Sequence, residues 1–472
     1  MRPANPLSSS LPPLIMGTAT FNSQYNSDPY ALPTTELVQR ALARGIRAFD
    51  TSPYYGPAEE LLGQALATQT VQSNYPRESY HLLTKVGRIA SSSFDYSPSW
   101  IRHSVRRSLR RLHTSYLDVV YCHDVEFVTP DEVLSAVREL RRLRDEEGVL
   151  RYIGISGYPV DILSGFAELV LNETGEPLDI VMSYANFTLQ NTRLRSEALP
   201  RLLKAGVDVV PNASPLGMGL LRRDGVPIGA MGDFHPAPDA LRGVIQDAAS
   251  CADSRGEKLE VVAIRFALES WLRAGARAGG LGAPLAKSKD SDPGFISVAN
   301  VGVGRRLGVS VMGVSNVAEL EETLRVWNSI VDGLENWEED DDDSEYFARK
   351  FQSRGQSTGS STPATAVASS TPHASDILTP SEGLITDRAW SRTRRANILQ
   401  LAAEIRDIIG EQWIDYTWAS PGSDFENSLS EEHCTLVKRL EVEGEDMGPA
   451  IDDTTLADPM LTPPLDAERQ LE

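Results

Sequence analysis

Four side chains suited to proton transfer follow three short apolar runs in the first third of the chain: Asp50, Tyr55, Lys85 and His123. A phenol has a pKa near 10 and is a poor base at neutral pH. An ammonium within roughly 4–6 Å favours tyrosinate and lowers that pKa by about 1–3 units. We therefore expect Tyr55 to donate and accept protons and Lys85 to lower its pKa. Asp50 would hold Lys85, and His123 would orient a substrate oxygen. Beside a hydride acceptor, such a set performs carbonyl and carbinol redox chemistry.

Each of these residues also has an ordinary structural explanation. An Asp in a turn rich in Pro and Gly usually makes local hydrogen bonds. A single Lys at a strand end is more often half of an ion pair, and a single His is more often a satisfied hydrogen-bonding residue. The order of all four on successive strand ends is what favours a catalytic site.

Strands and helices alternate over residues 12–331, which predicts the scaffold that positions these groups. The predicted strands are short apolar runs, as expected when both faces of a parallel sheet are buried. We predict strands at 13–17, 46–50, 80–85, 117–122, 152–156, 179–183, 207–212 and 309–314. We predict helices at 34–43, 58–67, 98–112, 130–147, 160–171, 192–203, 258–274 and 317–331.

Eight such pairs predict an α/β fold of the (β/α)8 TIM-barrel type, in which catalytic groups lie at the carboxyl ends of the strands. A doubly wound open sheet is the alternative. The first strand and turn, residues 16–20, lack the Gly-x-Gly-x-x-Gly pattern that favours it.

We predict the barrel over residues 1–335. The composition changes in one insertion within this range and again after it. A loop insertion rich in Gly, Ala, Ser and Pro is expected at 276–305. An acidic and Ser/Thr-rich linker at 336–394 and an acidic tail at 421–472 are predicted to be disordered, because neither buries enough apolar surface to offset chain entropy. Residues 395–420 are predicted to form a C-terminal helical segment that packs on the barrel, with Ile398, Leu401, Ile405, Ile408 and Ile409 on its apolar face.

Composition excludes several classes of protein. The formal net charge is −21, with 41% hydrophobic and 24% charged residues, and the excess of acids lies mostly after residue 330. The sequence has no strongly basic stretch of the kind that would indicate a nucleic-acid partner. It also has no apolar run long enough to predict a membrane span or a signal peptide. Three scattered cysteines show no metal-binding spacing and suggest a reducing compartment. We expect a cytoplasmic protein, monomeric or weakly dimeric, with no metal.

Several motifs resemble the aldo-keto reductase superfamily: residues 49–56 (FDTSPYYG), 84–87 (TKVG), 121–124 (YCHD), 153–157 (IGISG) and 214–221 (SPLGMGLL). Within it, the chain is similar to aldose dehydrogenases acting on D-arabinose and L-galactose, through Pro-Tyr-Tyr-Gly, His-Asp-Val-Glu-Phe and the segment 413–421. The resemblance implies a barrel binding a nicotinamide dinucleotide and a catalytic tetrad of Asp50, Tyr55, Lys85 and His123.

The resemblance also implies cofactor contacts. Gly17 and Thr18 would lie under the nicotinamide ribose, beside Asp50. Ser156 matches the Ser that binds the carboxamide, although its usual Asn neighbour is Gly157 and the usual Gln of the sixth strand falls near Met182. The loop with Ser214, Leu216, Gly217 and Gly219 would cradle the pyrophosphate. Ser315 and Asn316 would face the adenosine phosphate at a helix N-terminus, unless they are a plain helix cap.

NAD is expected in preference to NADP. In NADP-preferring members of the superfamily a Lys follows the eighth strand and an Arg lies about six residues later. Aligning on Glu321 and Glu322 puts Gly313 and Glu319 at those positions, and we expect Glu319 and Glu322 among the cofactor contacts. Glu319 would repel a 2′-phosphate, or it is simply an acid favoured in a first helical turn.

Three functions are compatible with these residues. The first is an NAD-dependent aldose 1-dehydrogenase that oxidises D-arabinose, L-galactose or L-fucose to the aldonolactone. The second is an NAD(P)H-dependent aldehyde or ketone reductase. The third is a non-catalytic cofactor-binding regulator. The intact tetrad argues against this function, because a regulator does not need a complete set of catalytic side chains.

Overall fold

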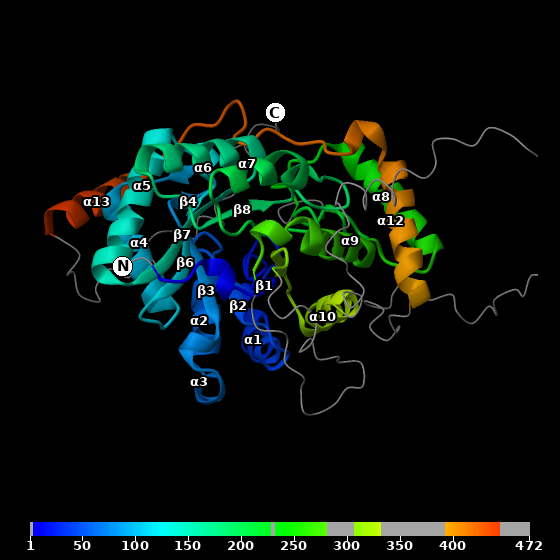
Figure 1. Cartoon of the computed structure of the whole chain (residues 1–472), viewed down its shortest axis with the longest axis horizontal. Coiled ribbons are helices and arrows are strands. Elements are labelled where there is room, and N and C mark those ends of the chain that lie inside the picture. The colour runs from blue at the N-terminus through cyan, green and yellow to red at the C-terminus, as the bar shows by residue number, and fades with distance from the viewer. Residues whose placement is uncertain (1–2, 228–231, 281–305, 332–391, 444–472) are drawn as a thin grey trace, which may run out of the picture.

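Eight parallel strands close into a barrel in the computed structural model of the chain, which describes residues 3–227, 232–280, 306–331 and 392–443. The order around the barrel is β1-β10-β9-β8-β7-β6-β3-β2, and helices surround it (Figure 1). The strands are β1 (Leu14–Gly17), β2 (Ala48–Asp50), β3 (His81–Val86), β6 (Leu117–His123), β7 (Leu150–Gly157), β8 (Ile180–Tyr184), β9 (Asn212–Ala213) and β10 (Ser310–Gly313). The predicted TIM barrel is confirmed.

The helices around the barrel follow the predicted pattern closely. Their apolar faces pack on the outside of the strands in one large core. They are α1 (Thr34–Ala43), α2 (Ala58–Leu66), α4 (Pro98–Arg111), α5 (Pro130–Arg142), α6 (Val160–Thr174), α7 (Leu199–Lys204), α9 (Leu259–Ala274) and α10 (Val317–Val331). α5 shows why such boundaries are readable, since Thr129 and Glu132 form a capping box at its start.

The strand prediction was least accurate at β9. We predicted residues 207–212, but regular pairing covers only Asn212–Ala213, with an isolated bridge between Val209 and Ile180. Pro211 lies between these pairings and has no N–H to donate, so it interrupts the ladder.

The prediction missed several elements. These are α3 (Gln69–Asn74), α8 (Asp239–Ser254), α13 (Glu431–Glu443) and a hairpin of β4 (Arg88–Ala90) and β5 (Ser93–Phe94). The buried face of α8 consists mainly of small side chains, among them Ala248, Ala249 and Ala252. The helical spacing of its apolar residues is therefore hard to recognise in the sequence.

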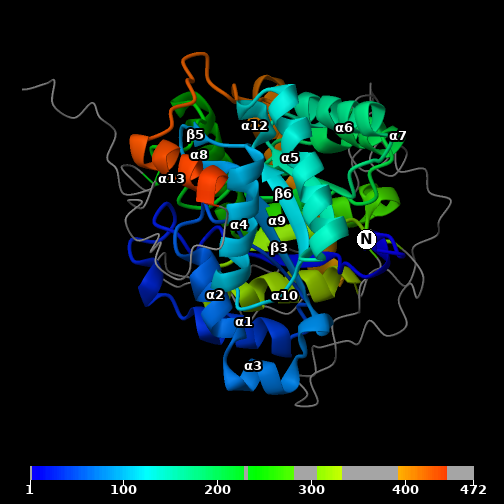
Figure 2. The same ribbon diagram turned by 90° about the vertical axis from the view of Figure 1, so that its left-hand side faces the viewer.

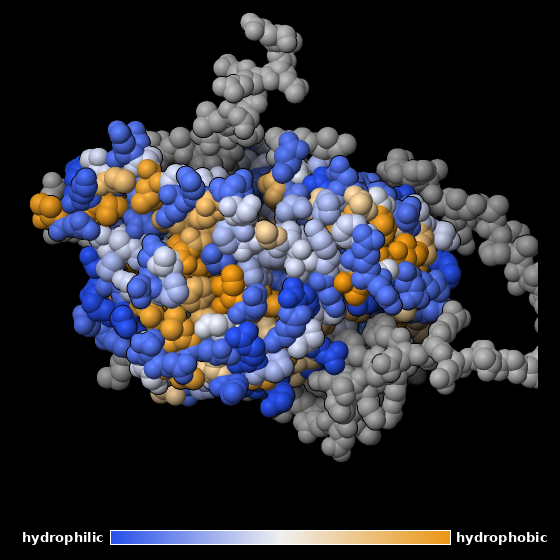
Figure 3. Space-filling view, turned by 90° about the horizontal axis from the view of Figure 1, so that it is seen from above, coloured by the Kyte–Doolittle hydropathy of each residue, from blue (hydrophilic) through white to orange (hydrophobic). Residues whose placement is uncertain are grey.

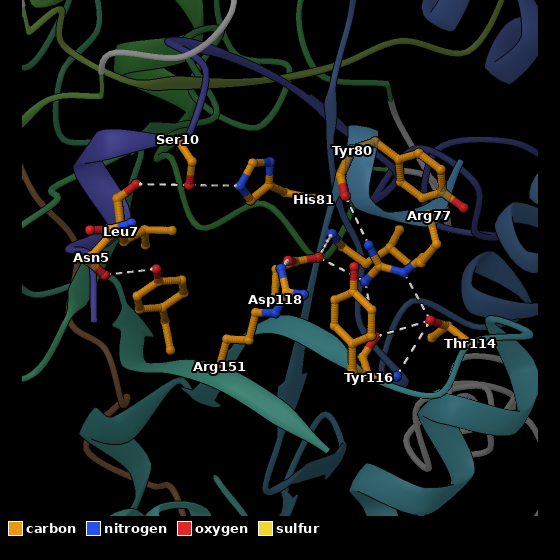
Figure 4. Close-up of polar contacts among 12 residues, drawn as sticks. Asn5, Leu7, Ser10, Arg77, Tyr80, His81, Thr114, Tyr116, Asp118 and Arg151 are labelled. Carbon is orange, nitrogen blue, oxygen red and sulfur yellow. Dashed lines mark hydrogen bonds and ion pairs between the residues drawn. The ribbon is translucent and has the colours of Figure 1, made fainter. Parts of the chain in front are cut away.

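The amino end of the barrel is sealed by the start of the chain. Leu7 and Leu11 are fully buried and extend the apolar filling of the barrel interior. Polar contacts fasten this plug: Ser10 Oγ lies 3.1 Å from His81 Nε2, and the Tyr152 hydroxyl donates to the Asn5 carbonyl at 3.0 Å (Figure 4). Access to the barrel is therefore from the carboxyl ends of the strands.

A second cluster at the same end centres on the carboxylate of Asp118 (Figure 4). It accepts hydrogen bonds from Arg77 at 2.7 Å and Arg151 at 3.2 Å. Each guanidinium carbon lies 4.0 Å from the ring centroid of Tyr116. This buried acid therefore has a purely structural setting, far along β6 from the opposite strand end.

The C-terminal segment returns to the barrel as predicted. Helix α12 (Arg392–Trp413) packs against α8 and α9, with Ile398, Leu401, Ile405 and Ile409 buried. Our prediction was wrong for Ile408, which is 37% exposed. The regular helix ends at Gly410, whose φ is +73°.

The prediction of a disordered tail over 421–472 was wrong for its first part. Helix α13 lies across α4 (Figure 2). Leu436 and Leu440 pack against Trp100, and His433 Nε2 lies 2.8 Å from Asp95 Oδ2. These few apolar residues in an acidic context suffice because α4 supplies the rest of the core. Residues 444–472, 336–391 and 281–305 of the predicted tail, linker and insertion lie outside the described residues.

The outer surface mixes residue types. Seen from above, hydrophobic residues form patches separated by hydrophilic ones (Figure 3). Within the described ranges, no helix has the length and apolarity needed to cross a membrane.

Candidate active site

An ion pair lies at the carboxyl ends of β2 and β3. Lys85 Nζ is 2.6 Å from Asp50 Oδ1 and donates to the Thr51 carbonyl at 2.8 Å. The side chains are 1% and 5% exposed. Burial raises the pKa of Asp50, and the Lys85 charge opposes that rise. The ion pair therefore forms the buried floor of the candidate site.

Tyr55 and His123 lie above this pair. Lys85 Nζ is 4.8 Å from the Tyr55 ring centroid, and the rings of Tyr55 and His123 are 5.8 Å apart and nearly perpendicular. Tyr55 reaches this position through the turn after β2, where its N–H donates to the Ser52 carbonyl at 3.1 Å. The structure thus brings all four predicted catalytic side chains together.

The pKa of Tyr55 differs from our prediction. We expected Lys85 to lower it, but it is raised well above the ordinary value by burial, with the Asp50 and Asp124 carboxylates adding to the rise. Lys85 makes its shortest contact with Asp50, and the negative charge of Asp50 offsets the positive charge of Lys85 at the phenol. Tyr55 is therefore protonated at neutral pH in this structure.

His123 is neutral for a similar reason. Burial lowers the pKa of His123 to about 3, although the charge of the nearby Asp124 carboxylate acts to raise it. Its Nδ1 lies 3.2 Å from Ser52 Oγ, which accepts from the Tyr54 N–H at 3.1 Å. Since that hydroxyl is already an acceptor, its proton is available to Nδ1. This arrangement favours the tautomer with the proton on Nε2.

Three functional candidates beside His123 were missed. Asp124 Oδ2 lies 3.7 Å from His123 Nε2 and accepts from Arg88 Nη1. Arg88 also donates to the Tyr54 hydroxyl at 3.0 Å, and its guanidinium carbon lies 3.9 Å from that ring centroid. Arg88 three residues beyond Lys85 and Asp124 directly after His123 were the only sequence signals.

Aromatic side chains from distant parts of the chain gather at the same end of the barrel. Trp418 stacks on Tyr158 at 4.6 Å between centroids and meets His235 edge-on at 5.5 Å. Tyr25 meets Phe234 at 5.6 Å, and its pKa is raised by burial and by Tyr55 and Tyr54. Aromatic faces of this kind suit the C–H surfaces of a small organic substrate.

Trp418 is brought there by the segment that follows α12. This segment runs from α12 on one side of the barrel to α13 on the other (Figure 1). Ser420 Oγ donates to Glu126 Oε1 at 3.0 Å, and the same oxygen accepts from the Tyr158 N–H at 2.9 Å. Burial and the Asp124 charge raise the pKa of Glu126 to about 8. The segment therefore crosses the mouth of the barrel.

The predicted nicotinamide contacts lie on two pairs of neighbouring strands, β7 with β8 and β1 with β2. Ser156 pairs in register with His123 on one side and Met182 on the other. Its Oγ is buried without a hydrogen-bond partner among the described residues, which fits a group that binds a carboxamide. Gly17 pairs with Asp50, while Thr18 uses its hydroxyl internally, donating to the Asp50 carbonyl at 3.1 Å.

The loop after β9, which we predicted to cradle the pyrophosphate, has several residues with a left-handed backbone. Ser214, Gly217, Met218 and Gly219 all have φ between +53° and +96°. Leu216 is the acceptor for the turn, since its carbonyl accepts from the Gly219 and Leu221 N–H groups. The Gly217 N–H donates to the Ser214 carbonyl at 2.8 Å, so part of the backbone of this loop is already used inside the turn, and the pyrophosphate contacts stay a prediction.

The start of α10 is a complete helix cap. The Asn316 side chain accepts from the Glu319 N–H at 2.9 Å, and Glu319 accepts from the Ser315 N–H at 2.7 Å. Glu319 is thus fixed at the helix N-terminus, as its plain structural explanation required. Gly313 has little room for a side chain, because a Cβ there would lie 3.0 Å from Thr20 Cγ2.

Glu322 has a different environment. It is 3% exposed, and its pKa is raised by burial against the charges of Arg394 and Arg325. Arg394 itself is held by Glu257 through two hydrogen bonds of 2.8 Å. Glu322 is therefore a buried acid of α10 under the charge of Arg394 from α12, and its expected contact with the cofactor stays a prediction.

Comparison with known proteins gives consistent results. The aldo/keto reductase family model matches residues 13–333. D-arabinose 1-dehydrogenase of Saccharomyces cerevisiae is 41% identical over 268 residues, which cover 56% of this chain and 78% of that protein. L-galactose dehydrogenase of Arabidopsis thaliana is 37% identical over 234 residues, covering 49% and 68%.

A solved structure of a glycerol dehydrogenase from Gluconobacter oxydans aligns with a TM-score of 0.47 and 20% identity, over 76% of this chain and 98% of that one. The fold assignment rests on the closed barrel itself.

Proposed function

Because the chain belongs to the aldo/keto reductase family, we propose that it is an NAD-dependent aldose 1-dehydrogenase. Its substrate would be D-arabinose or a related aldose such as L-galactose or L-fucose, and its product the aldonolactone. The observation that carries the proposal is the buried Lys85–Asp50 pair beneath Tyr55 and His123. The names of the two dehydrogenases similar to this chain support the choice of an aldose.

The tetrad supplies proton transfer and orientation. The anomeric hydroxyl binds between the Tyr55 phenol and His123 Nε2, which donates to the substrate oxygen. Tyr55, as phenolate, takes the hydroxyl proton while the C1–H bond breaks and the C1–O bond becomes a carbonyl. A bound nicotinamide dinucleotide supplies the hydride acceptor. Ser156, Met182 and the loop around Gly217 are the residues that would hold it.

The high pKa of Tyr55 favours one alternative specifically. A protonated phenol is ready to act as the general acid in reduction of a carbonyl group, so aldehyde or ketone reduction is our second candidate. In the oxidation, Tyr55 must first lose its proton.

Initial rates with purified protein test both candidates. A panel of aldoses with NAD and NADP, and a panel of aldehydes and ketones with NADH and NADPH, would be compared by kcat/KM. The proposal expects the highest value for an aldose with NAD. A higher value for a simple aldehyde would favour the reductase, and no cofactor-linked absorbance change in any assay would favour a non-catalytic regulator.

The choice of NAD over NADP rests on residues near α10. Gly313 has no side chain where a Lys would contact a 2′-phosphate, and Glu319 holds a carboxylate at the neighbouring helix terminus. A carboxylate repels a phosphate and accepts a hydrogen bond from a ribose hydroxyl.

A further inference from the structure

We propose that Arg88 and Asp124 form a polyol subsite that binds the substrate hydroxyl next to the reacting carbon. This inference deepens the proposed aldose dehydrogenase function and rests on it. Asp124 and Arg88 would then be the residues through which the protein selects an aldose over a simple alcohol or aldehyde.

The position of the pair supports this role. Asp124 Oδ2 lies 3.7 Å from His123 Nε2, the nitrogen that meets the substrate oxygen. Arg88 and Asp124 both act on the pKa of the Tyr55 phenol, in opposite directions. A hydroxyl on the carbon adjacent to C1 therefore falls beside this pair when C1 is held by Tyr55 and His123.

The hydrogen-bonding capacity of the pair is only partly used within the protein. Asp124 is 2% exposed, and its Oδ1 is buried without a hydrogen-bond partner among the described residues. A guanidinium has five N–H donors, and Arg88 makes three hydrogen bonds, to Asp124, the Tyr54 hydroxyl and the Ala90 carbonyl. A buried acceptor next to spare donors matches a hydroxyl, which both donates and accepts.

Neighbouring groups hold the pair rigidly. Asp124 has a left-handed backbone, with φ of +55°, and its carboxylate is fixed by the ion pair with Arg88 Nη1. Arg88 lies in the β4–β5 hairpin, with its guanidinium carbon 3.9 Å from the Tyr54 ring centroid. Such preorganised polar groups reject a substrate that lacks the matching hydroxyl, because they are then left unpaired.

The test compares D-arabinose with its 2-deoxy counterpart. We expect the wild type to prefer D-arabinose by about a hundredfold or more in kcat/KM. Asp124→Asn keeps the size of the side chain but removes its charge, and we expect the ratio of kcat/KM for the two sugars to fall below about tenfold, whatever the change in the rate common to both. Arg88→Lys, which keeps the charge but loses the fork, should lower the preference in the same direction.

Asp118→Asn is the matched control. Asp118 is an equally buried acid paired with two arginines, at the opposite end of β6. This variant should lose stability but keep the full preference for D-arabinose.

Two results would overturn the inference while leaving the dehydrogenase intact: a wild type indifferent to the 2-hydroxyl, or Asp124→Asn and Arg88→Lys variants that lose activity on both sugars equally. If the wild type oxidised no aldose with either cofactor, the proposed function itself would fail.

Discussion

Replacing Glu319 should change which nicotinamide cofactor the protein prefers. The carboxylate accepts from the Ser315 N–H at 2.7 Å, so it stays at the N-terminus of α10 rather than swinging into solvent. Glu319→Arg would exchange a negative charge for a cation with donors suited to phosphate. We expect kcat/KM with NADP to rise and that with NAD to fall.

The size of the effect follows from the contacts involved. A hydrogen bond to a charged group contributes roughly 1.5–3 kcal/mol, and about 1.4 kcal/mol corresponds to a factor of ten. One new contact to a 2′-phosphate, together with one repulsion removed, should therefore shift the NADP/NAD ratio by about tenfold to a few hundredfold. Gly313 remains without a side chain, so a full reversal of preference is not expected.

Glu319 also caps a helix, and this second role needs its own control. Losing the cap costs about 0.5–2 kcal/mol of stability. Glu319→Gln keeps an oxygen for the Ser315 N–H and removes only the charge, so its melting temperature should stay near that of the wild type. Initial rates with both cofactors and thermal melts would be measured on all three proteins.

The control also separates repulsion from new attraction. Glu319→Gln should improve NADP use by less than Glu319→Arg does. The reasoning would be refuted if the wild type used NADP as well as NAD, or if Glu319→Arg left the ratio unchanged while its fold stayed intact.

Three further predictions concern the tetrad. Tyr55→Phe should lower kcat by about 10²–10⁴-fold with the cofactor dissociation constant unchanged; near-full kcat at neutral pH would contradict the proton-transfer role. Lys85→Met would leave the Asp50 carboxylate buried without its partner and should destabilise the fold by about 3–5 kcal/mol in urea unfolding; an unchanged midpoint would mean that Asp50 is protonated or hydrated there. The raised pKa of Tyr55 means that oxidation gains rate as pH rises, because the base is the phenolate, whereas reduction loses rate through the same ionisation. Because the pKa of Tyr55 lies above its ordinary value, pre-steady-state oxidation rates should rise from pH 6 to about 10 while reduction rates stay flat and fall only at higher pH; reduction and oxidation rates that changed in parallel would exclude Tyr55 as the titrating group.

The sequence alone determined the barrel and the order of its catalytic side chains. Apolar runs too short for helices alternate with helices of clear period, and parallel strands connected in this way close into a barrel. Asp50, Lys85 and His123 could then be brought together from sequence, because the carboxyl ends of β2, β3 and β6 meet at one edge. Helix α12 was readable for a similar reason, since its buried face has an unbroken apolar period.

Only the tertiary structure decided the charge state and the walls of the site. Whether Lys85 lowers the pKa of Tyr55 depends on a balance between burial and several charges in three dimensions, and burial prevails. Trp418 reaches the mouth through the bond from Ser420 to Glu126, across 294 positions of sequence. Such contacts leave no local pattern, because side chains so far apart carry no shared period or spacing that the chain could show.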